Sequence, residues 1–322
     1  MHYSQSEKME IIRIVEGSQI GVVRTLRELG IHPSVFYKWY NSYKEKGYDG
    51  LARKKRRQFW NEIPPWEKDR VVETALEKPE KSPRELAYHI IDEQKYFISE
   101  SSVYRILKSR GLITSPAYIV MKAADKFKQP TQRINEMWQT DFTYFKIIGW
   151  GWYYLSTIMD DYSRFIIAWD LCKTMKSYDV ENTIQKALER SELSKEQRPK
   201  LLSDNGSCYI SKELKGYLND KGIKHVRGAP NHPQTQGKIE RYHRTMKNVI
   251  KLDNYYLPGE LKLRLNEFVD YYNNHRYHES LQNLTPADVY YGRAEEILNQ
   301  RALTKQKTMI KRRNFYENQL YL

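Results

Sequence analysis

Three acidic residues in this chain have the types and the spacing needed to hold metal ions. Asp141 lies in an aromatic and β-branched stretch, Asp204 ends the apolar run LLS just before Asn-Gly, and Glu240 follows with thirty-five residues between it and Asp204. Clustered carboxylates repel one another unless cations lie among them, and their oxygen atoms suit Mg²⁺ or Mn²⁺. Two such ions ~3.5–4 Å apart can activate an attacking oxygen and stabilise a leaving one. The spacing therefore indicates metal-dependent phosphoryl transfer.

Other interpretations of these acids stay open. Asp204 could simply shape a turn, because Asp-Asn-Gly is typical of turns. Asp160 and Asp161 compete with Asp141 for the first metal position. They fall in the turn-like DDYSR, where carboxylates commonly accept hydrogen bonds from backbone amides, so we expect them to be structural. Zinc is not expected, because the eight histidines are scattered and neither H-E-x-x-H nor paired C-x-x-C occurs.

A strand-rich region after residue 135 must position these acids. The stretch 136–148 alternates like a strand, and this alternation puts Gln139, Asp141 and Thr143 on one face. Two further strands are expected in 151–172, around a tight turn at 160–163. The elements expected after them are a helix over 177–190, a strand over 200–203, a helix over 211–221, a strand over 222–227 and a long helix from 236 past 250. A three-strand meander followed by alternating helices and strands predicts a mixed α/β sheet.

The long helix that carries Glu240 presents two faces side by side. Helical spacing groups Glu240 with Gln236, Arg244 and Lys247, and we expect this face to meet the metal and to contact DNA through those three residues. The apolar stripe beside it, expected to face the core, consists of Ile239, Tyr242, Met246 and Val249. The plainer alternative is that Glu240 and Arg244 form an exposed i,i+4 ion pair.

Residues 6–48 are predicted to form three short helices, because apolar residues recur there at helical spacing between Gly-containing turns. A helix, a turn and a further helix form the helix-turn-helix pattern, whose last helix enters the major groove of DNA. The expected outer side of that helix consists of Ser34, Tyr37, Lys38 and Asn41. The alternative is a small helical bundle that binds protein.

A basic arm after these helices favours DNA as the partner. Between Lys38 and Gln58 there are eight Lys or Arg residues against two acids. Each neutralised phosphate releases counterions whatever the base sequence, so such an arm suits the DNA backbone. The expected phosphate contacts are Arg53, Lys54, Lys55, Arg56 and Arg57.

The composition agrees with a nucleic-acid partner. The 322 residues carry a formal net charge of +14, which favours a polyanion. The two cysteines, Cys172 and Cys208, are too few for a disulfide framework and suit a reducing compartment. The sequence contains neither a signal peptide nor an apolar run of the ~20 residues that a membrane span needs. We therefore expect a cytoplasmic protein with no membrane partner.

A second helical unit is expected over residues 66–113. Pro64-Pro65 marks a boundary before it. Ser82 begins a capping box with Pro83 at the first helical position, so a helix is expected to start there. Because this unit also has a helix-turn-helix pattern, the tandem pair suggests a long or bipartite DNA site.

Three motifs resemble one family in their order and spacing. WQTDFTYF, LLSDNGSCYIS and APNHPQTQGKIERYHRTMK are similar to the integrase core of bacterial insertion-sequence transposases and retroviral integrases, the DDE superfamily. The later YYNNHRYHESLQNLTPADVYYG resembles the segment that closes this core in bacterial transposases. With the helical units, the resemblance covers residues 6–293.

The resemblance implies a multidomain chain, with N-terminal all-α tandem helix-turn-helix units before an α/β ribonuclease-H-like integrase core with a mixed sheet. In that core Asp141, Asp204 and Glu240 would bind two Mg²⁺ or Mn²⁺ ions. It also implies a homo-oligomer on double-stranded DNA, at element ends and target, in the bacterial nucleoid. There, hydrolysis would release a 3′-hydroxyl that attacks target DNA directly. The retroviral zinc-binding module is missing, so no zinc is implied.

The expected divisions and the open alternatives complete this interpretation. The divisions are a helix-turn-helix domain (1–50), a basic linker (51–65), a second helix-turn-helix domain (66–113), a linker (114–133), the catalytic core (134–255), a core-closing helical segment (256–300) and a basic tail (301–322). His275, Arg276 and His278 either reach DNA or lie at the surface. The chain could instead be a transposase-derived DNA-binding regulator, or a metal-dependent nuclease without strand transfer. The many tyrosines raise the possibility of a tyrosine recombinase, but the arginine and histidine residues that such an enzyme needs cannot be assigned in this sequence.

Overall fold

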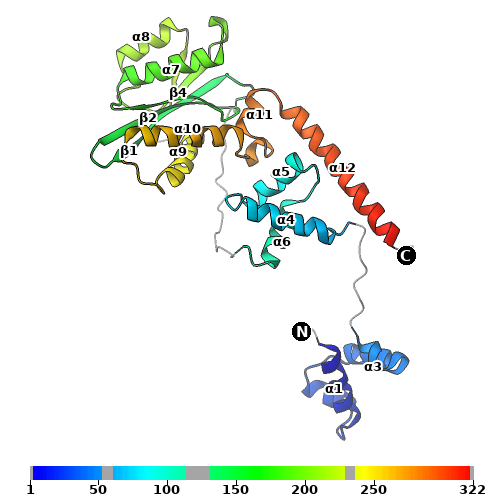
Figure 1. The fold of residues 1–322 in the computed structure, drawn as a ribbon. Helices are drawn as coiled ribbons and strands as arrows, with labels where there is room; N and C mark the ends of the chain where they lie inside the picture. The colour runs from blue at the N-terminus through cyan, green and yellow to red at the C-terminus, as the bar shows by residue number, and fades with distance from the viewer. Residues whose placement is uncertain (1–2, 53–60, 114–130, 229–235, 320–322) are drawn as a thin grey trace. The chain divides into compact units, whose positions relative to one another are not determined.

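The computed structural model describes residues 3–52, 61–113, 131–228 and 236–319 (Figure 1). The chain divides into two compact units, residues 63–314 and residues 1–62 together with 315–322. Most of the two predicted linkers, including Arg53, Lys54, Lys55, Arg56 and Arg57, lies outside the described residues.

The N-terminal unit contains the helices α1 (Gln5–Glu16), α2 (Val22–Glu28) and α3 (Pro33–Lys46), followed by the short 3-10 helix η1 (Gly47–Leu51). The predicted helices are thus confirmed, with Pro33 in the first turn of α3. Ile12, Leu26 and Phe36, one from each α-helix, meet in a small apolar core. Because each helix contributes one apolar side to this core, the opposite side of α3 stays exposed.

A second group of helices begins the larger unit: α4 (Pro65–Glu77), α5 (Pro83–Glu93) and α6 (Glu100–Ser109). The predicted capping box is confirmed, because the Ser82 hydroxyl accepts from the Glu85 amide and the Glu85 carboxylate accepts from the Ser82 amide. The three helices share an apolar core built around Val71, Ile90 and Val103.

A mixed sheet forms the centre of the larger unit. Its strands are β1 (Met137–Ile147), β2 (Gly151–Asp160), β3 (Ile166–Cys172), β4 (Lys200–Ser203) and β5 (Lys224–Arg227). Within the described residues the order is β3-β2-β1-β4-β5. The meander β1-β2-β3 is antiparallel, whereas β4 runs parallel to both β1 and β5. The predicted mixed α/β sheet is therefore confirmed.

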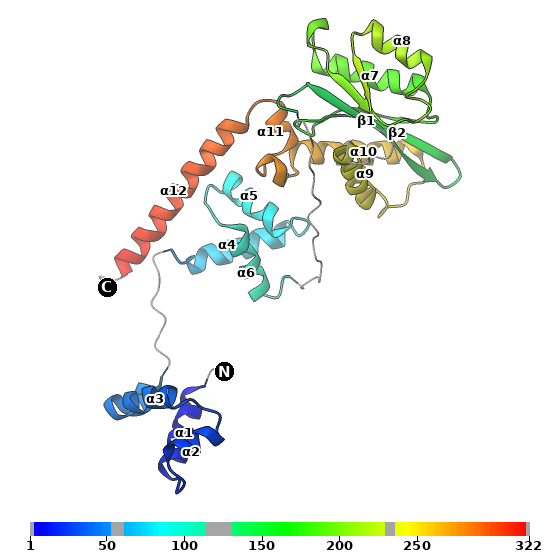
Figure 2. The same cartoon turned by 180° about the vertical axis from the view of Figure 1, so that it is seen from behind.

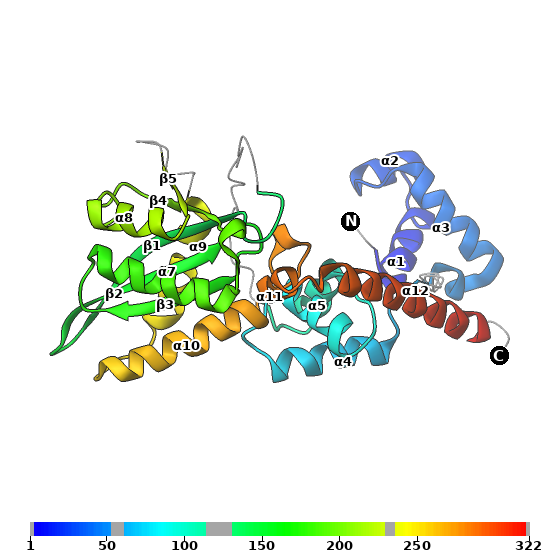
Figure 3. The ribbon, with the colours of Figure 1, turned by 90° about the horizontal axis from the view of Figure 1, so that it is seen from above.

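Helices cover both faces of this sheet (Figures 1 and 3). On one face, α7 (Ser177–Ser191) and α8 (Lys212–Asp220) pack on a core that includes Trp138 and Ile158. On the other, α9 (Gly237–Ile250) and α10 (Pro258–Asn274) pack on Phe145 and Leu155. Alternation along β1 therefore turns its odd-numbered residues, Asp141 among them, towards α9 and α10.

The C-terminal part differs from its predicted division at residue 300. After α11 (Pro286–Tyr290), one continuous helix, α12 (Ala294–Gln319), runs through this boundary and lies beside α4 and α5 (Figure 2). The residues of α12 that are buried in the larger unit are Arg301, Thr304, Thr308 and Arg312. Because this stripe is polar, the apolar spacing that predicts helices does not reveal it.

The polar stripe of α12 contacts the second group of helices directly. The guanidinium of Arg301 donates to both carboxylate oxygens of Asp92, at 2.8 and 2.6 Å. Arg312 donates to Glu67 at 2.7 Å and to the Phe97 carbonyl, also at 2.7 Å. The Phe97 amide in turn donates to the Thr308 hydroxyl at 2.9 Å. What the sequence presents as a basic tail is thus a packed helix as far as Arg312.

Candidate catalytic centre

Asp141 lies in β1, and Asp204 directly follows the neighbouring parallel strand β4. Gln139 of β1 is opposite Leu202 of β4, so the same register carried on by two residues puts Asp141 opposite Asp204. Adjacent strands are about 4.8 Å apart, and residues opposite each other in a sheet point to the same face. The sequence alone could not establish this register. In the structure, the register brings the end of β4, which Asp204 follows, level with the middle of β1, where Asp141 lies.

The Asp204 carboxylate shapes a turn and still faces solvent. Its Oδ1 accepts from the Gly206 amide at 2.8 Å, as expected of an Asp-Asn-Gly turn. The Asn205 side chain donates to the Gly228 carbonyl at 3.0 Å, which ties the turn to the end of β5. Asp204 is exposed, so the turn presents its carboxylate at the sheet edge. The two interpretations of this residue are therefore compatible.

The electrostatics near the sheet edge link the same two carboxylates. Burial raises the pKa of the Cys208 thiol to about 11, and the negative charges of Asp204 and Asp141 add to the effect. Tyr209 has its pKa raised well above the usual range by burial, and again both aspartates contribute. Both carboxylates therefore act on one small region beside the turn.

Helix α9 runs alongside β1 and brings Glu240 towards this region. The buried Gln139 side chain accepts from the Ile239 amide at 3.1 Å, and the Gln236 side chain donates to the Thr140 carbonyl at 3.3 Å. One turn further on, His243 Nδ1 lies 3.3 Å from an Asp141 carboxylate oxygen. Glu240 lies between these contacts on the helix and is exposed.

The three carboxylates do not meet in one ligand set. Within the described part of the chain, no group of three or more His, Cys, Asp and Glu side chains is placed to hold a metal ion. Asp141 lies in β1 and Asp204 directly after β4, whereas Glu240 is exposed on α9, which packs on the same face of the sheet. Carboxylates that lack a cation between them repel, so their side chains are expected to spread apart. The three-acid metal site stays a prediction.

Asp160 and Asp161 have structural contacts, as predicted. Asp160 accepts from the backbone amides of Asn135 and Ser163, both at 2.8 Å. Asp161 accepts from the Gln139 side chain at 2.6 Å and from the Lys238 ammonium at 2.7 Å. Because both carboxylates are buried and used by these bonds, neither competes with Asp141 for a metal ion.

The residues predicted to contact DNA fall into three groups. On α3, the side chains of Ser34, Tyr37, Lys38 and Asn41 are all exposed, as a recognition surface requires. Arg244 is exposed on α9, and the Lys247 ammonium lies 4.5 Å from the centre of the Tyr144 ring. Gln236, in contrast, is buried and bonded to the backbone of β1, so its position favours support of α9 over the predicted DNA contact.

The two histidines of the core-closing segment differ in their exposure to solvent. His275 is exposed, whereas His278 is largely buried against the Tyr272 ring. Burial and nearby arginines lower the pKa of His278 to about 3. His278 is therefore a neutral structural residue.

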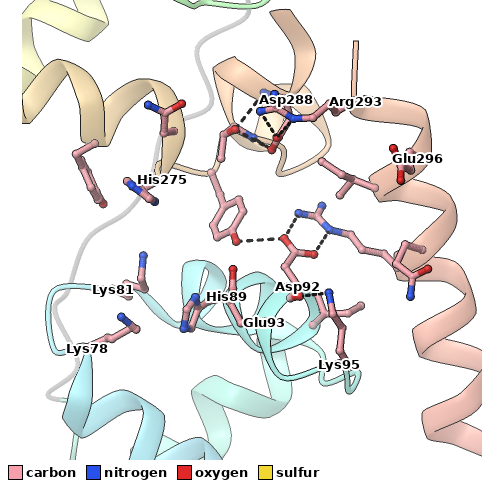
Figure 4. Close-up of a pocket in the computed structure, with 18 of the residues that line it drawn as sticks. Lys78, Lys81, His89, Asp92, Glu93, Lys95, His275, Asp288, Arg293 and Glu296 are labelled. Carbon is pink, nitrogen blue, oxygen red and sulfur yellow. Dashed lines mark hydrogen bonds and ion pairs between the residues drawn. The ribbon is translucent and has the colours of Figure 1, made fainter. Parts of the chain in front are cut away.

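A cavity in the larger unit lies away from all of these carboxylates. It measures about 920 Å³ and is lined by parts of α5, the end of α10, α11 and α12. Figure 4 shows Lys78, Lys81, His89 and His275 at one end and Asp92 in its wall, where Asp92 pairs with Arg301. None of the predicted catalytic residues lines it.

Comparison with known families identifies the sheet-containing region. Residues 131–233 and 221–286 each match an integrase core domain, and residues 35–107 match a homeodomain-like domain. The chain contains an integrase core. The matched segments include the elements that carry Asp141, Asp204 and Glu240. The homeodomain-like match runs from inside α3 to α6, across both groups of N-terminal helices.

The chain with this integrase core is homologous to insertion-sequence transposases. It is 29% identical over 187 residues to InsK of the insertion sequence element IS150 from Escherichia coli (strain K12), covering 58% of this chain and 64% of that protein. It is 25% identical over 187 residues to the IS629 transposase from Shigella sonnei, covering 57% and 62%. The matched regions thus span a little under two thirds of each relative.

Solved structures of viral integrases also align with part of this chain. The HTLV-2 integrase catalytic core domain in complex with magnesium aligns with a TM-score of 0.39 and 23% identity, covering 49% of this chain and 97% of that one. The simian T-cell lymphotropic virus intasome aligns with a TM-score of 0.45 and 21% identity, covering 60% and 67%. Among the described residues, no helix combines the length and apolar character needed to cross a bilayer.

Proposed function

We propose that this chain is a DNA transposase that cleaves the ends of an insertion sequence and joins the 3′-hydroxyl to target DNA. The observation that carries the proposal is the β1–β4 register, whose last pair, Gln139 and Leu202, stands two residues before Asp141 and Asp204 in an integrase core. Helix α9 packs along β1 and carries Glu240. The three acids thus come from β1, from the residue that follows β4, and from α9.

The donor chemistry of these residues fits a hard divalent cation. All three side chains offer carboxylate oxygens, which Mg²⁺ and Mn²⁺ prefer. Asp141, Asp204 and Glu240 would hold two such ions. When bound, these ions supply charge stabilisation for the attacking and leaving oxygens of a phosphodiester.

The chain's own residues would bind and orient the DNA. Arg244 and Lys247 follow Glu240 on the exposed and half-exposed side of α9, where they can neutralise phosphates next to the carboxylates. The exposed side of α3 would enter the major groove at the element ends. We also propose that the active form is a homo-oligomer, because two element ends must be joined to one target.

Asp204→Asn tests the catalytic assignment. The change keeps the size and turn propensity of the side chain but removes the charge that a cation needs. Folding and end binding should survive, while cleavage and strand transfer on a supercoiled plasmid should both collapse. Strand-transfer products would also separate a transposase from a nuclease that only cuts and from a regulator that only binds.

The matched control is Asp220→Asn, at the exposed end of α8. Asp220 makes no ion pair within the described residues, so its variant should keep wild-type activity. Substantial strand transfer by the Asp204→Asn protein would falsify the site.

The exposed side of α3 gives a second test, on DNA recognition by the full chain. Lys38→Ala should weaken binding to all sequences and lower the slope of log affinity against log salt by about 1, as expected for one lost phosphate contact. Asn41→Ala should instead reduce the preference for the element end over random DNA. Binding is measured by fluorescence anisotropy over a range of salt. Unchanged slope and unchanged preference would exclude α3 as the recognition helix.

A further inference from the structure

His243 lies buried between α9 and the sheet, directly over Asp141. Its Nδ1 is 3.3 Å from an Asp141 carboxylate oxygen, and its Nε2 is 3.3 Å from the Thr157 hydroxyl. The His243 side chain is 7% exposed and the Asp141 side chain 21%. The ring is therefore enclosed, whereas the carboxylate still opens to solvent.

The two contacts of His243 use both nitrogens of its ring. Nδ1 faces the Asp141 carboxylate, which accepts when it is ionised. Nε2 shares a hydrogen bond with the Thr157 hydroxyl, and either of these two groups can donate. Thr157 is also the cross-strand partner of Asp141, so both side chains stand next to each other on the face that α9 covers. The imidazole thus bridges β1 and β2 from the helix.

The other contact of Asp141 comes from its own backbone region. Its Oδ1 accepts from the Phe142 amide at 2.8 Å, whereas Oδ2 faces His243. A carboxylate oxygen can accept more than one bond, so both oxygens keep a free position for a ligand. Because each carboxylate oxygen of Asp141 has one contact, rotation of the carboxylate about the Cβ–Cγ bond is restrained.

We propose that His243 is a positioning residue that orients the Asp141 carboxylate for cation binding and sets its distance from Glu240. The inference rests on the proposed function. Glu240 lies one turn before His243, on the same side of α9, because residues three apart on a helix are neighbours. The His243–Asp141 contact therefore connects the strand carboxylate to the helix carboxylate. Groups that hydrogen-bond to metal-ligating carboxylates typically change metal affinity or activity 10–100-fold when removed, by rough estimate.

The test measures Mn²⁺ binding to the full-length protein by electron paramagnetic resonance, without DNA and without turnover. His243→Asn places an amide where Nδ1 was, so it can still donate to Asp141. His243→Gln places its amide near the position of Nε2, and His243→Ala removes both contacts. We expect His243→Ala and His243→Gln to weaken Mn²⁺ binding about 10–100-fold, and His243→Asn to keep most of it. Thr157→Val should have a smaller effect, because it leaves the Asp141 contact in place.

Melting temperature in EDTA is measured for each variant, with His89→Ala on α5 as the control for loss of a half-buried histidine. Unchanged Mn²⁺ affinity in His243→Ala would overturn the inference. So would equal losses in His243→Asn and His243→Ala that follow the drop in melting temperature, because that pattern indicates a packing role. Asp141→Asn distinguishes failure of the proposed metal site from failure of the inference on His243. If it leaves Mn²⁺ binding unchanged, the proposed metal site itself fails. If it abolishes binding while His243→Ala does not weaken it, the inference on His243 alone fails.

Discussion

Four aspartates near the sheet edge look alike in the sequence and differ in their contacts. Asp160 and Asp161 are buried and accept hydrogen bonds from their surroundings, whereas Asp204 is exposed and Asp141 is partly exposed. The turn-like DDYSR was sufficient to predict this difference, because a local turn creates the need for amide acceptors. The position of His243 over Asp141 could not be predicted, because it depends on how α9 packs against β1.

His278 gives a prediction on acid stability. The backbone of His278 forms an isolated β-bridge with Leu284, and its ring packs on the Tyr272 ring. The charged groups that face it are arginines from four parts of the larger unit: Arg164, Arg276, Arg84 and Arg241. Burial, followed by these charges, lowers the pKa of His278 to about 3 from a usual value of 6.5.

Because the folded pKa lies below the unfolded one, the unfolded chain binds the proton more tightly between these two values. His278 therefore leaves the free energy of unfolding unchanged above about pH 6.5. Below that pH, its effect lowers the free energy of unfolding by up to about 1.4 kcal/mol per pH unit. His278→Gln should flatten this dependence between pH 6.5 and 5, as measured by urea unfolding. His275→Gln, at an exposed position, should keep the wild-type slope. Equal slopes in all three proteins would contradict the assignment.

At the scale of elements, the start of α9 is fixed by a buried polar network. The Gln139 side chain accepts from the Ile239 amide in the first turn of α9 and donates to Asp161. Asp161 also accepts from Lys238, the second residue of the helix. Gln139 and Ile239 are 100 residues apart in sequence. The sequence predicted the helix and its apolar stripe from local periodicity, but no local pattern reveals a cap that comes from a distant strand.

Asp161→Asn should therefore disturb α9 more than it disturbs the turn in which Asp161 lies. The change removes the carboxylate that Lys238 and Gln139 contact, and leaving buried polar groups without it costs about 1–3 kcal/mol. Hydrogen–deuterium exchange should become faster in the first turns of α9, next to Glu240. The exposed Asp220→Asn should leave exchange there unchanged. Wild-type protection of α9 in Asp161→Asn would show that the network does not hold the helix.

At the scale of the whole molecule, α12 holds the second group of helices through polar contacts. The helix runs without a break through residue 300, and its packing depends on Arg301, Thr304, Thr308 and Arg312. Leu303 and Ile310, which an apolar pattern would place inside, are exposed. The five-stranded sheet and the helical units were predictable from periodicity and caps, whereas this long-range packing depends on paired charges.

A charge exchange between Arg301 and Asp92 tests this packing. Arg301→Asp alone brings two carboxylates together in a mostly buried place and should cost about 3 kcal/mol or more of unfolding free energy. Asp92→Arg combined with Arg301→Asp should restore part of that loss, because opposite charges face each other again. Thermal unfolding of the single and double variants measures both effects. Arg264→Ala, which removes an exposed pair with Glu267, should change stability by less than about 1 kcal/mol. No recovery in the double variant would exclude a direct charge pairing.

The polar stripe also has a consequence for the order in which the chain is made. Asp92 and Arg301 are 209 residues apart, and Glu67 and Arg312 are 245 apart. At synthesis rates of about 5–20 residues per second, the second group of helices waits roughly 10–50 s on the ribosome for α12. During this time the groups that later pair with α12 include the Asp92 and Glu67 carboxylates and the Phe97 carbonyl, which water solvates well. An apolar stripe on α12 would need an apolar partner surface, which would stay exposed and prone to aggregation on every nascent chain. The polar stripe therefore lets the early helices fold and stay soluble before α12 is made.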